Sequence, residues 1–202
     1  MSKIQFKTIF KHLHTIHTHR KWVRYYCFLA GIPWRGITHD LSKYSPIEFW
    51  ESVKFYTGFN SPIENAKKAQ GYSRAWLHHR GRNTHHWAYW ADNFSEGMTV
   101  HLMPEKDFVE MVCDFLGAGQ AYSRESFTYY KEYKWWQKER EGGCKAMHPA
   151  NKKMLDIILW DLQVAENPVK YGHLRKMVHT PEQLLKLGYI QDVYNANKNY
   201  TE

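Results

Sequence analysis

Helix start signals recur along this chain, and they constrain its fold more than any other feature. Residues 45–48 (Ser-Pro-Ile-Glu) and 61–64 (Ser-Pro-Ile-Glu) are capping boxes with proline at the first helical position, and residues 180–183 (Thr-Pro-Glu-Gln) form a third. The Ser or Thr side chain accepts a hydrogen bond from an early helical N–H, and the Glu or Gln reaches back to the cap. Proline fits there because its missing N–H would be unpaired anyway. Between these signals apolar residues recur with a helical period, so the sequence predicts an all-α fold.

The same signals place the helices and one domain boundary. Strand-like alternation is nearly absent, and we expect helices at about residues 4–30, 34–43, 46–57, 62–80, 84–92, 105–122, 125–140, 149–165 and 181–195. The stretch Glu141-Gly142-Gly143 is the best linker candidate. We therefore predict a helical metal-binding domain over residues 1–142 and an accessory helical segment, packed on it, over residues 143–202.

Charge and cysteine content bound the partners and the compartment. A net charge of +8 suits an anionic partner, such as nucleic acid, a nucleotide, a phosphate ester or a membrane surface. A generally basic surface without such a partner is the alternative. Three cysteines without a CxxC pair exclude a full disulfide framework and favour the reducing cytoplasm. No apolar run approaches the ~18 residues of a membrane helix, and the basic N-terminus lacks the apolar stretch of a signal peptide.

The first chemical motif is the adjacent pair His39-Asp40, followed by Lys43. Adjacent residues do not share a helix face, but at a helix end both side chains can turn toward one metal ion. Imidazole nitrogen and carboxylate oxygen together suit Mn, Fe, Ni, Co or Zn. Lys43 lies one turn beyond His39, where an ammonium could neutralise a phosphate oxygen. The alternative is a capped helix end with incidental charges.

The second motif places two His-His pairs on either side of a short turn. The pairs are His78-His79 and His85-His86, and the turn between them contains Gly81 and Asn83. A turn sets two helix ends side by side, so imidazoles from both can point at one ion. Arg80 and Arg82 add fixed positive charge that suits an anion. The alternative is a pair of exposed polar helix ends.

Two further candidate ligands lie on the first helix and on the helix near residue 114. Asp114 stands in an apolar helical stretch, where a buried carboxylate needs a metal or a cation as partner. An exposed stripe of Asp107, Glu110 and Asp114 is the alternative. His19 precedes the apolar step Trp22-Val23, which would dock it against the core.

In order, these residues resemble the pattern of the HD-domain superfamily of metal-dependent phosphohydrolases. That pattern has a histidine on an early helix, an adjacent His-Asp on a later one, further histidines and a distal aspartate. The resemblance implies an HD-like helical bundle with accessory C-terminal helices and one or two divalent transition-metal ions. It also implies that the metal ligands come from His19, His39, Asp40, His78, His79, His85, His86 and Asp114. More closely, residues 36–43 and 75–87 look like an uncharacterised bacterial and phage family, a domain of unknown function.

We expect hydrolysis of a small anionic substrate that bears phosphate, with a nucleotide among the candidates. The ions would activate water, while Lys43, Arg80 and Arg82 would steady the developing negative charge. One alternative is a di-iron HD-type oxygenase. The other is a non-catalytic basic protein that binds nucleic acid or a partner protein through aromatics such as Tyr129, Tyr130, Trp135 and Trp136. Those aromatics lie at helical spacing, which favours helix packing over base stacking. The sequence leaves oligomerisation open.

Overall fold

The computed structural model describes residues 6–94 and 97–164, and most of these residues are helical. The helices are α1 (Phe6–Leu29), α2 (Pro33–Thr38), α3 (Pro46–Phe55), α4 (Pro62–Gln70), α5 (Arg74–Arg80), α6 (Glu105–Ser123), α7 (Tyr129–Glu141) and α8 (Pro149–Val164). Short 3₁₀ turns lie at η1 (Leu41–Tyr44), η2 (Trp87–Trp90) and η3 (Arg124–Ser126). The strands β1 (Ala91–Phe94) and β2 (Gly97–Val100) form an antiparallel hairpin. The predicted all-α fold is confirmed.

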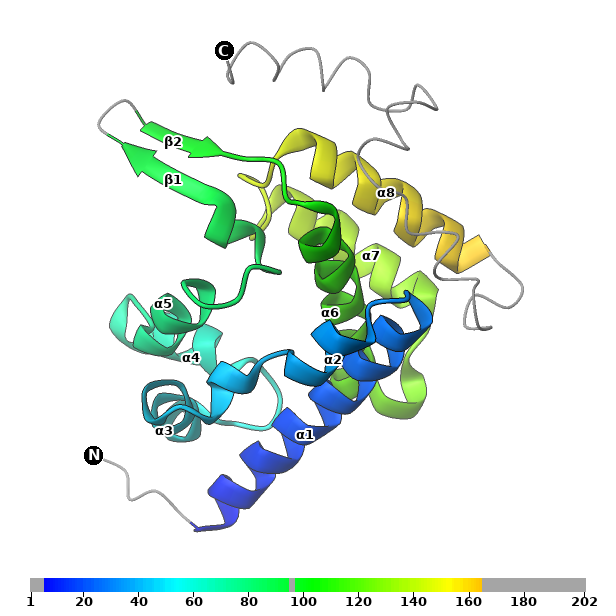
Figure 1. The fold of residues 1–202 in the computed structure, drawn as a ribbon. Coiled ribbons are helices and arrows are strands. Elements are labelled where there is room, and N and C mark those ends of the chain that lie inside the picture. The colour runs from blue at the N-terminus through cyan, green and yellow to red at the C-terminus, as the bar shows by residue number, and fades with distance from the viewer. Residues whose placement is uncertain (1–5, 95–96, 165–202) are drawn as a thin grey trace.

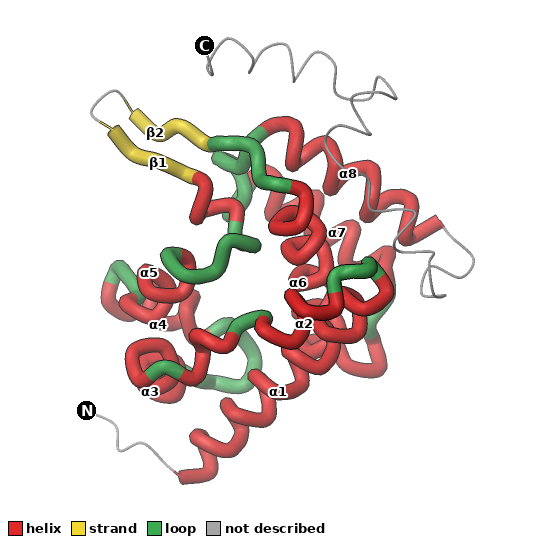
Figure 2. The backbone as a smooth tube through the Cα atoms, viewed as in Figure 1, coloured by secondary structure: helices red, strands yellow, loops and turns green. Residues whose placement is uncertain are grey.

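Two groups of helices face each other across the molecule (Figure 1). Helices α3, α4 and α5 pack together on one side, and α6, α7 and α8 lie on the other. Helix α1 runs along both groups, because it packs on α6 and also contacts α3. The path from α1 through α2 to η1 crosses between the groups, as the backbone tube in Figure 2 shows. These connecting segments therefore lie between the two groups of helices.

The hydrophobic core lies among α1, α6, α7 and α8. Its members from α1 include Val23 and Cys27, and its members from α6 include Phe108 and Cys113, all fully buried. The accessory segment predicted from residue 143 contributes to this same core through buried apolar residues of α8 and the turn before it, namely Cys144, Met147, Ala150, Met154, Leu155, Ile158, Leu159 and Leu162. A boundary at residue 142 stays a prediction, and the helix predicted at 181–195 lies outside the described residues.

A glycine sets the close approach of α1 and α6. A Cβ on Gly117 would lie 2.5 Å from Val23 Cγ2 and 2.9 Å from Val23 N, which is too close for two non-bonded heavy atoms. Only a residue without a side chain allows the two helix backbones to pack this tightly. Because α1 carries His19 and α6 carries Asp114, this packing also fixes the distance between two candidate ligands.

The structure corrects four sequence-based predictions of local structure. The helix predicted over residues 34–43 ends at Thr38, and a separate 3₁₀ turn begins at Leu41. The helix predicted over residues 62–80 is broken at Gly71, whose left-handed backbone (φ 79°) caps α4 before Ser73 starts α5. The helix predicted over residues 84–92 is a loop, a 3₁₀ turn and the first strand of the hairpin. The capping boxes are also incomplete. Ser61 makes no side-chain cap bond, and the Glu48 carboxylate binds histidines instead of reaching back to Ser45.

Within the described ranges, no helix combines the length and the apolarity that crossing a membrane requires. The three cysteines, Cys27, Cys113 and Cys144, are free and buried.

Candidate metal centre

The break between α2 and η1 turns His39 and Asp40 toward one point. His39 ends α2, and Asp40 adopts the left-handed conformation with φ 55° and ψ 27°. Among the described residues other than glycine, Asp40 alone has a positive φ. Strained backbone positions of this kind concentrate at functional sites. Arg20 of α1 supports the break, because its guanidinium donates to the carbonyls of Ile37 and His39, at 2.8 Å each. In the structure this adjacent pair therefore lies directly after the end of a helix.

Four donor atoms from three parts of the chain meet at this point, and we call them donor group A. His19 Nε2 lies 3.1 Å from Asp114 Oδ1 and 3.2 Å from Asp40 Oδ2. His39 Nε2 lies 3.3 Å from both Asp40 Oδ2 and Asp114 Oδ1. Ligands held at 2.0–2.2 Å from one ion lie about 3 to 3.5 Å from each other. The spacing in donor group A is therefore that of a metal coordination shell, with the members His19, His39, Asp40 and Asp114.

A second set of donors surrounds the other oxygen of Asp40, and we call it donor group B. Asp40 Oδ1 lies 3.3 Å from His79 Nε2 and 3.5 Å from His85 Nε2. His86 completes the group, whose donor atoms all lie within 4.8 Å of one another. Asp40 Oδ1, His85 Nε2 and His86 Nε2 are buried and have no hydrogen-bond partner. Leaving such atoms unpaired is costly, and a bound cation is a partner that would satisfy all three. The residues present thus fit a divalent metal ion.

Two buried glutamates orient the histidines of both groups from behind. Glu110 Oε1 lies 2.8 Å from His39 Nδ1 and 3.2 Å from His85 Nδ1. Glu48 Oε2 lies 2.7 Å from His79 Nδ1. An ionised carboxylate only accepts, so each Nδ1–H donates to it and leaves the Nε2 lone pair facing the centre. This is the outer-shell arrangement of metal-binding histidines.

Charge around the centre favours ionised carboxylates. Burial opposes the charge on Asp40, but His39 and Lys43 outweigh it and hold the pKa of Asp40 well below its usual value. Burial likewise opposes the charge on Glu110, and its hydrogen bonds from His39 and His85 lower its pKa to about 2. Burial lowers the pKa of His86, and its histidine neighbours add to that effect, which keeps its imidazole neutral. Ionised carboxylate and neutral imidazole are the forms that ligate metals.

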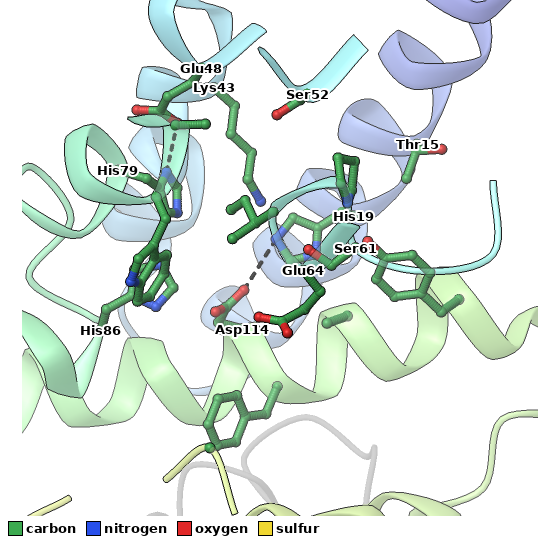
Figure 3. Close-up of a pocket in the computed structure, with 18 of the residues that line it drawn as sticks. Thr15, His19, Lys43, Glu48, Ser52, Ser61, Glu64, His79, His86 and Asp114 are labelled. Atoms are coloured by element: carbon green, nitrogen blue, oxygen red, sulfur yellow. Dashed lines mark hydrogen bonds and ion pairs between the residues drawn. The ribbon is translucent and has the colours of Figure 1, made fainter. Parts of the chain in front are cut away.

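The centre forms part of the wall of a cavity of about 370 Å³ (Figure 3). His19 and Asp114 face each other on one side, His79 and His86 lie on another, and the Lys43 ammonium points between them. Lys43 Nζ lies 2.5 Å from Asp40 Oδ2. Burial disfavours the charge on Lys43, but Asp40 and Asp114 outweigh it and raise its pKa. The charged Lys43 ammonium therefore lies beside Asp40 in the wall of the cavity.

The structure brings together most, but not all, of the site residues expected from the sequence. His79, His85 and His86 join the groups, whereas His78 lies outside them and contacts Glu48 Oε1 through its Nδ1 at 2.6 Å. Arg80 is partly buried and Arg82 exposed, and neither lines the cavity, so the expected contribution of these two cations does not fit this geometry. The exposed-stripe alternative for α6 is wrong, because Asp107, Glu110 and Asp114 are all buried.

Two orienting residues were not predicted as part of the site. Glu48 was assigned to a capping box. Glu110 was considered only in the exposed stripe, although it lies four residues before Asp114 and so shares its helix face. Arg35 of α2 reinforces Glu110, because its Nε lies 2.6 Å from Glu110 Oε2 while its Nη2 pairs with Asp107. Among the aromatics considered for base stacking, Trp136 is fully buried and cannot stack on a base.

Comparison with known proteins gives a family but no activity. No curated protein matches the chain, and no solved structure does. The profile of one family matches residues 8–160, which include every residue of both donor groups and both orienting glutamates. The chain therefore belongs to DUF5662, a family of unknown function.

Proposed function

We propose that this protein is a metal-dependent hydrolase of phosphate esters with a two-ion centre of the HD-domain kind. The observation that carries the proposal is the position of Asp40, whose two oxygens face different donor groups. One carboxylate shared between two sets of ligands is a suitable bridge between two metal ions. A pair of divalent ions would lower the pKa of a bound water and stabilise both the attacking and the leaving oxygen of a displaced phosphoryl group.

The chain's own residues would bind and orient the ester. Lys43 extends its ammonium into the cavity beside Asp40, where it can bind a non-bridging phosphate oxygen through a charge-assisted hydrogen bond. Glu48 and Glu110 hold the imidazoles of three ligands with Nε2 facing inward, so little reorganisation is needed when an ion binds. We also propose a cytoplasmic location, since the free buried cysteines fit a reducing compartment.

The test combines elemental analysis with a phosphatase assay on protein purified without a His-tag. We expect close to two ions per chain and phosphate release that a chelator abolishes. In Asp40→Ala both donor groups lose their shared ligand, so both the metal content and the activity should fall. Lys68→Met is a matched control, because Lys68 is exposed on α4 and lines neither the cavity nor a donor group. A wild-type protein that binds no added metal would contradict the proposal.

A di-iron oxygenase is the second candidate, and the histidine content of the centre favours it. Five histidines and two aspartates make up the two groups, and imidazole ligands suit iron as well as the hydrolytic metals. Purification with iron, together with oxygen uptake and without phosphate release from any ester, would favour this candidate over hydrolysis.

A further inference from the structure

The cavity offers little positive charge beyond Lys43, although the whole chain carries a net charge of +8. Lys67 is the other lysine in its wall, and its Nζ lies 3.1 Å from Glu64 Oε1 and 5.0 Å from the centre of the Trp76 ring. The carboxylates of Glu64 and Glu139 also line the wall, and no arginine does so within the described ranges. The protein's basic residues thus lie mainly outside the cavity.

This distribution limits how much anionic charge a ligand can bring. One phosphate group can be neutralised by the proposed ions and by Lys43. A second or third phosphate would lie along a wall whose remaining lysine is already paired and whose other charges are negative. Burying such a group without a partner is costly, so polyphosphates and polynucleotide backbones do not match this cavity.

Much of the remaining wall is apolar and aromatic, beside the hydroxyl groups of Thr15, Ser52 and Ser61 (Figure 3). It is built by α1, α4, α5, α6 and α7, and its large side chains include Ile16, Ile63, Trp76, Phe115, Tyr122 and Trp135. Phe115 and Trp135 meet edge to face, with ring centres 5.2 Å apart. Walls of this kind bind ligands through burial of apolar surface and ring contacts.

We infer that the substrate is a small phosphate monoester whose alcohol part is uncharged and apolar or aromatic. This inference rests on the proposed function and names its substrate class. In the reaction, the oxygen of water forms a new bond to phosphorus and the bond between phosphorus and the ester oxygen breaks. The ester oxygen takes up a proton from the attacking water, so the products are an alcohol and inorganic phosphate.

Direct binding tests the inference without relying on turnover. Phenylphosphonate carries one phosphonate on an aromatic ring, and its carbon–phosphorus bond resists hydrolysis. On protein loaded with Mn²⁺, we would measure its Kd by titration calorimetry beside those of inorganic phosphate, ATP and a single-stranded oligonucleotide. The expected order is tightest binding for phenylphosphonate, with inorganic phosphate weaker and the two polyanions weakest.

A variant and its control locate the aromatic contact. Trp135→Ala removes a half-exposed ring from the wall and should weaken phenylphosphonate about 2- to 10-fold while leaving the Kd of inorganic phosphate unchanged. Tyr130→Ala, on the same helix but outside the wall, should change neither value.

Each other outcome is decisive. Tighter binding of ATP or the oligonucleotide would overturn the substrate class and leave phosphate hydrolysis intact. The substrate class would also be overturned if phenylphosphonate bound no more tightly than inorganic phosphate. Equal weakening of phenylphosphonate and inorganic phosphate in Trp135→Ala would overturn it as well. Failure of all four probes to bind the manganese-loaded protein would overturn the proposed function together with this inference.

Discussion

Glu110 is the residue whose replacement tests the two-ion centre most sharply. Its Oε1 accepts from His39 Nδ1 at 2.8 Å and from His85 Nδ1 at 3.2 Å, and these histidines belong to different donor groups. Its Oε2 is held by Arg35. One carboxylate therefore orients a ligand in each group, so a change at Glu110 should weaken both metal positions.

Glu110→Gln keeps the shape of the side chain but cannot keep its contacts. If the amide oxygen faces the two Nδ1 atoms, the NH₂ group opposes Arg35, which is also a donor. If the amide turns over, its NH₂ group faces both Nδ1 atoms and favours the tautomer with hydrogen on Nε2. That hydrogen would occupy the lone pair that ligates the metal, so neither orientation preserves the centre.

The size of the effect follows from the number of ligands each glutamate orients. Loss of one outer-shell partner costs about 10- to 100-fold in metal affinity, or ~1.4 to 2.7 kcal/mol. In Glu110→Gln we expect this loss at both positions, larger at donor group A because the bond to His39 is the shorter one. Glu48 orients His79 alone among the ligands, so in Glu48→Gln we expect the loss of metal affinity at donor group B only.

Titration calorimetry with Mn²⁺, supported by elemental analysis after dialysis, measures both affinities. Circular dichroism would establish that the variants are folded before their affinities are compared. If Glu110→Gln kept wild-type metal affinity at both positions, the shared orienting role of Glu110 would be refuted. The same conclusion would follow if Glu110→Gln lost affinity at only one position, as Glu48→Gln is expected to do.

Three further predictions concern charge and packing. Lys43→Met removes the ammonium beside Asp40, so calorimetry should show inorganic phosphate binding to the metal-loaded protein ~10-fold or more weakly, with the metal content unchanged. Loss of the metal in this variant would show that Lys43 has a structural role instead. Burial raises the pKa of Glu132 from 4.5 to about 8, so its ionisation destabilises the folded state progressively as pH rises through that window. Thermal melts should therefore show Glu132→Gln more stable than wild type above pH about 8 and equal to it below pH about 4.5, and a constant difference would disprove the cause. Gly117→Ala should push α1 and α6 apart, so urea titrations should show the free energy of unfolding lowered by about 1 to 3 kcal/mol, and metal binding should weaken. An unchanged midpoint of urea unfolding would mean that the two helices adjust to the added methyl group.

Local rules of sequence explain what could be predicted about the helices. Proline and a capping side chain act within one turn, so the starts at residues 46 and 62 were predicted correctly from the sequence alone. The same rules missed the break at Gly71 and the paired strands at residues 91–94 and 97–100. There the left-handed glycine and the strand pairing overrode the helical pattern. The Ser61 cap bond, also expected from these rules, does not form.

The sequence by itself predicted that His39 and Asp40 could turn toward one metal ion and that the two His-His pairs flank a turn. It also placed Asp114 on a helix face with Glu110. The end of α2 at Thr38, just before the His39-Asp40 pair, was not predicted. Only the tertiary structure decided that His79 rather than His78 faces the centre, that Glu48 and Glu110 orient the ligands, and that the arginines of the turn lie outside the cavity. The reason is physical: spacing rules act within one element, whereas the centre joins α1, α2, α5 and α6. Their separation depends on core packing, such as the contact of Gly117 with Val23.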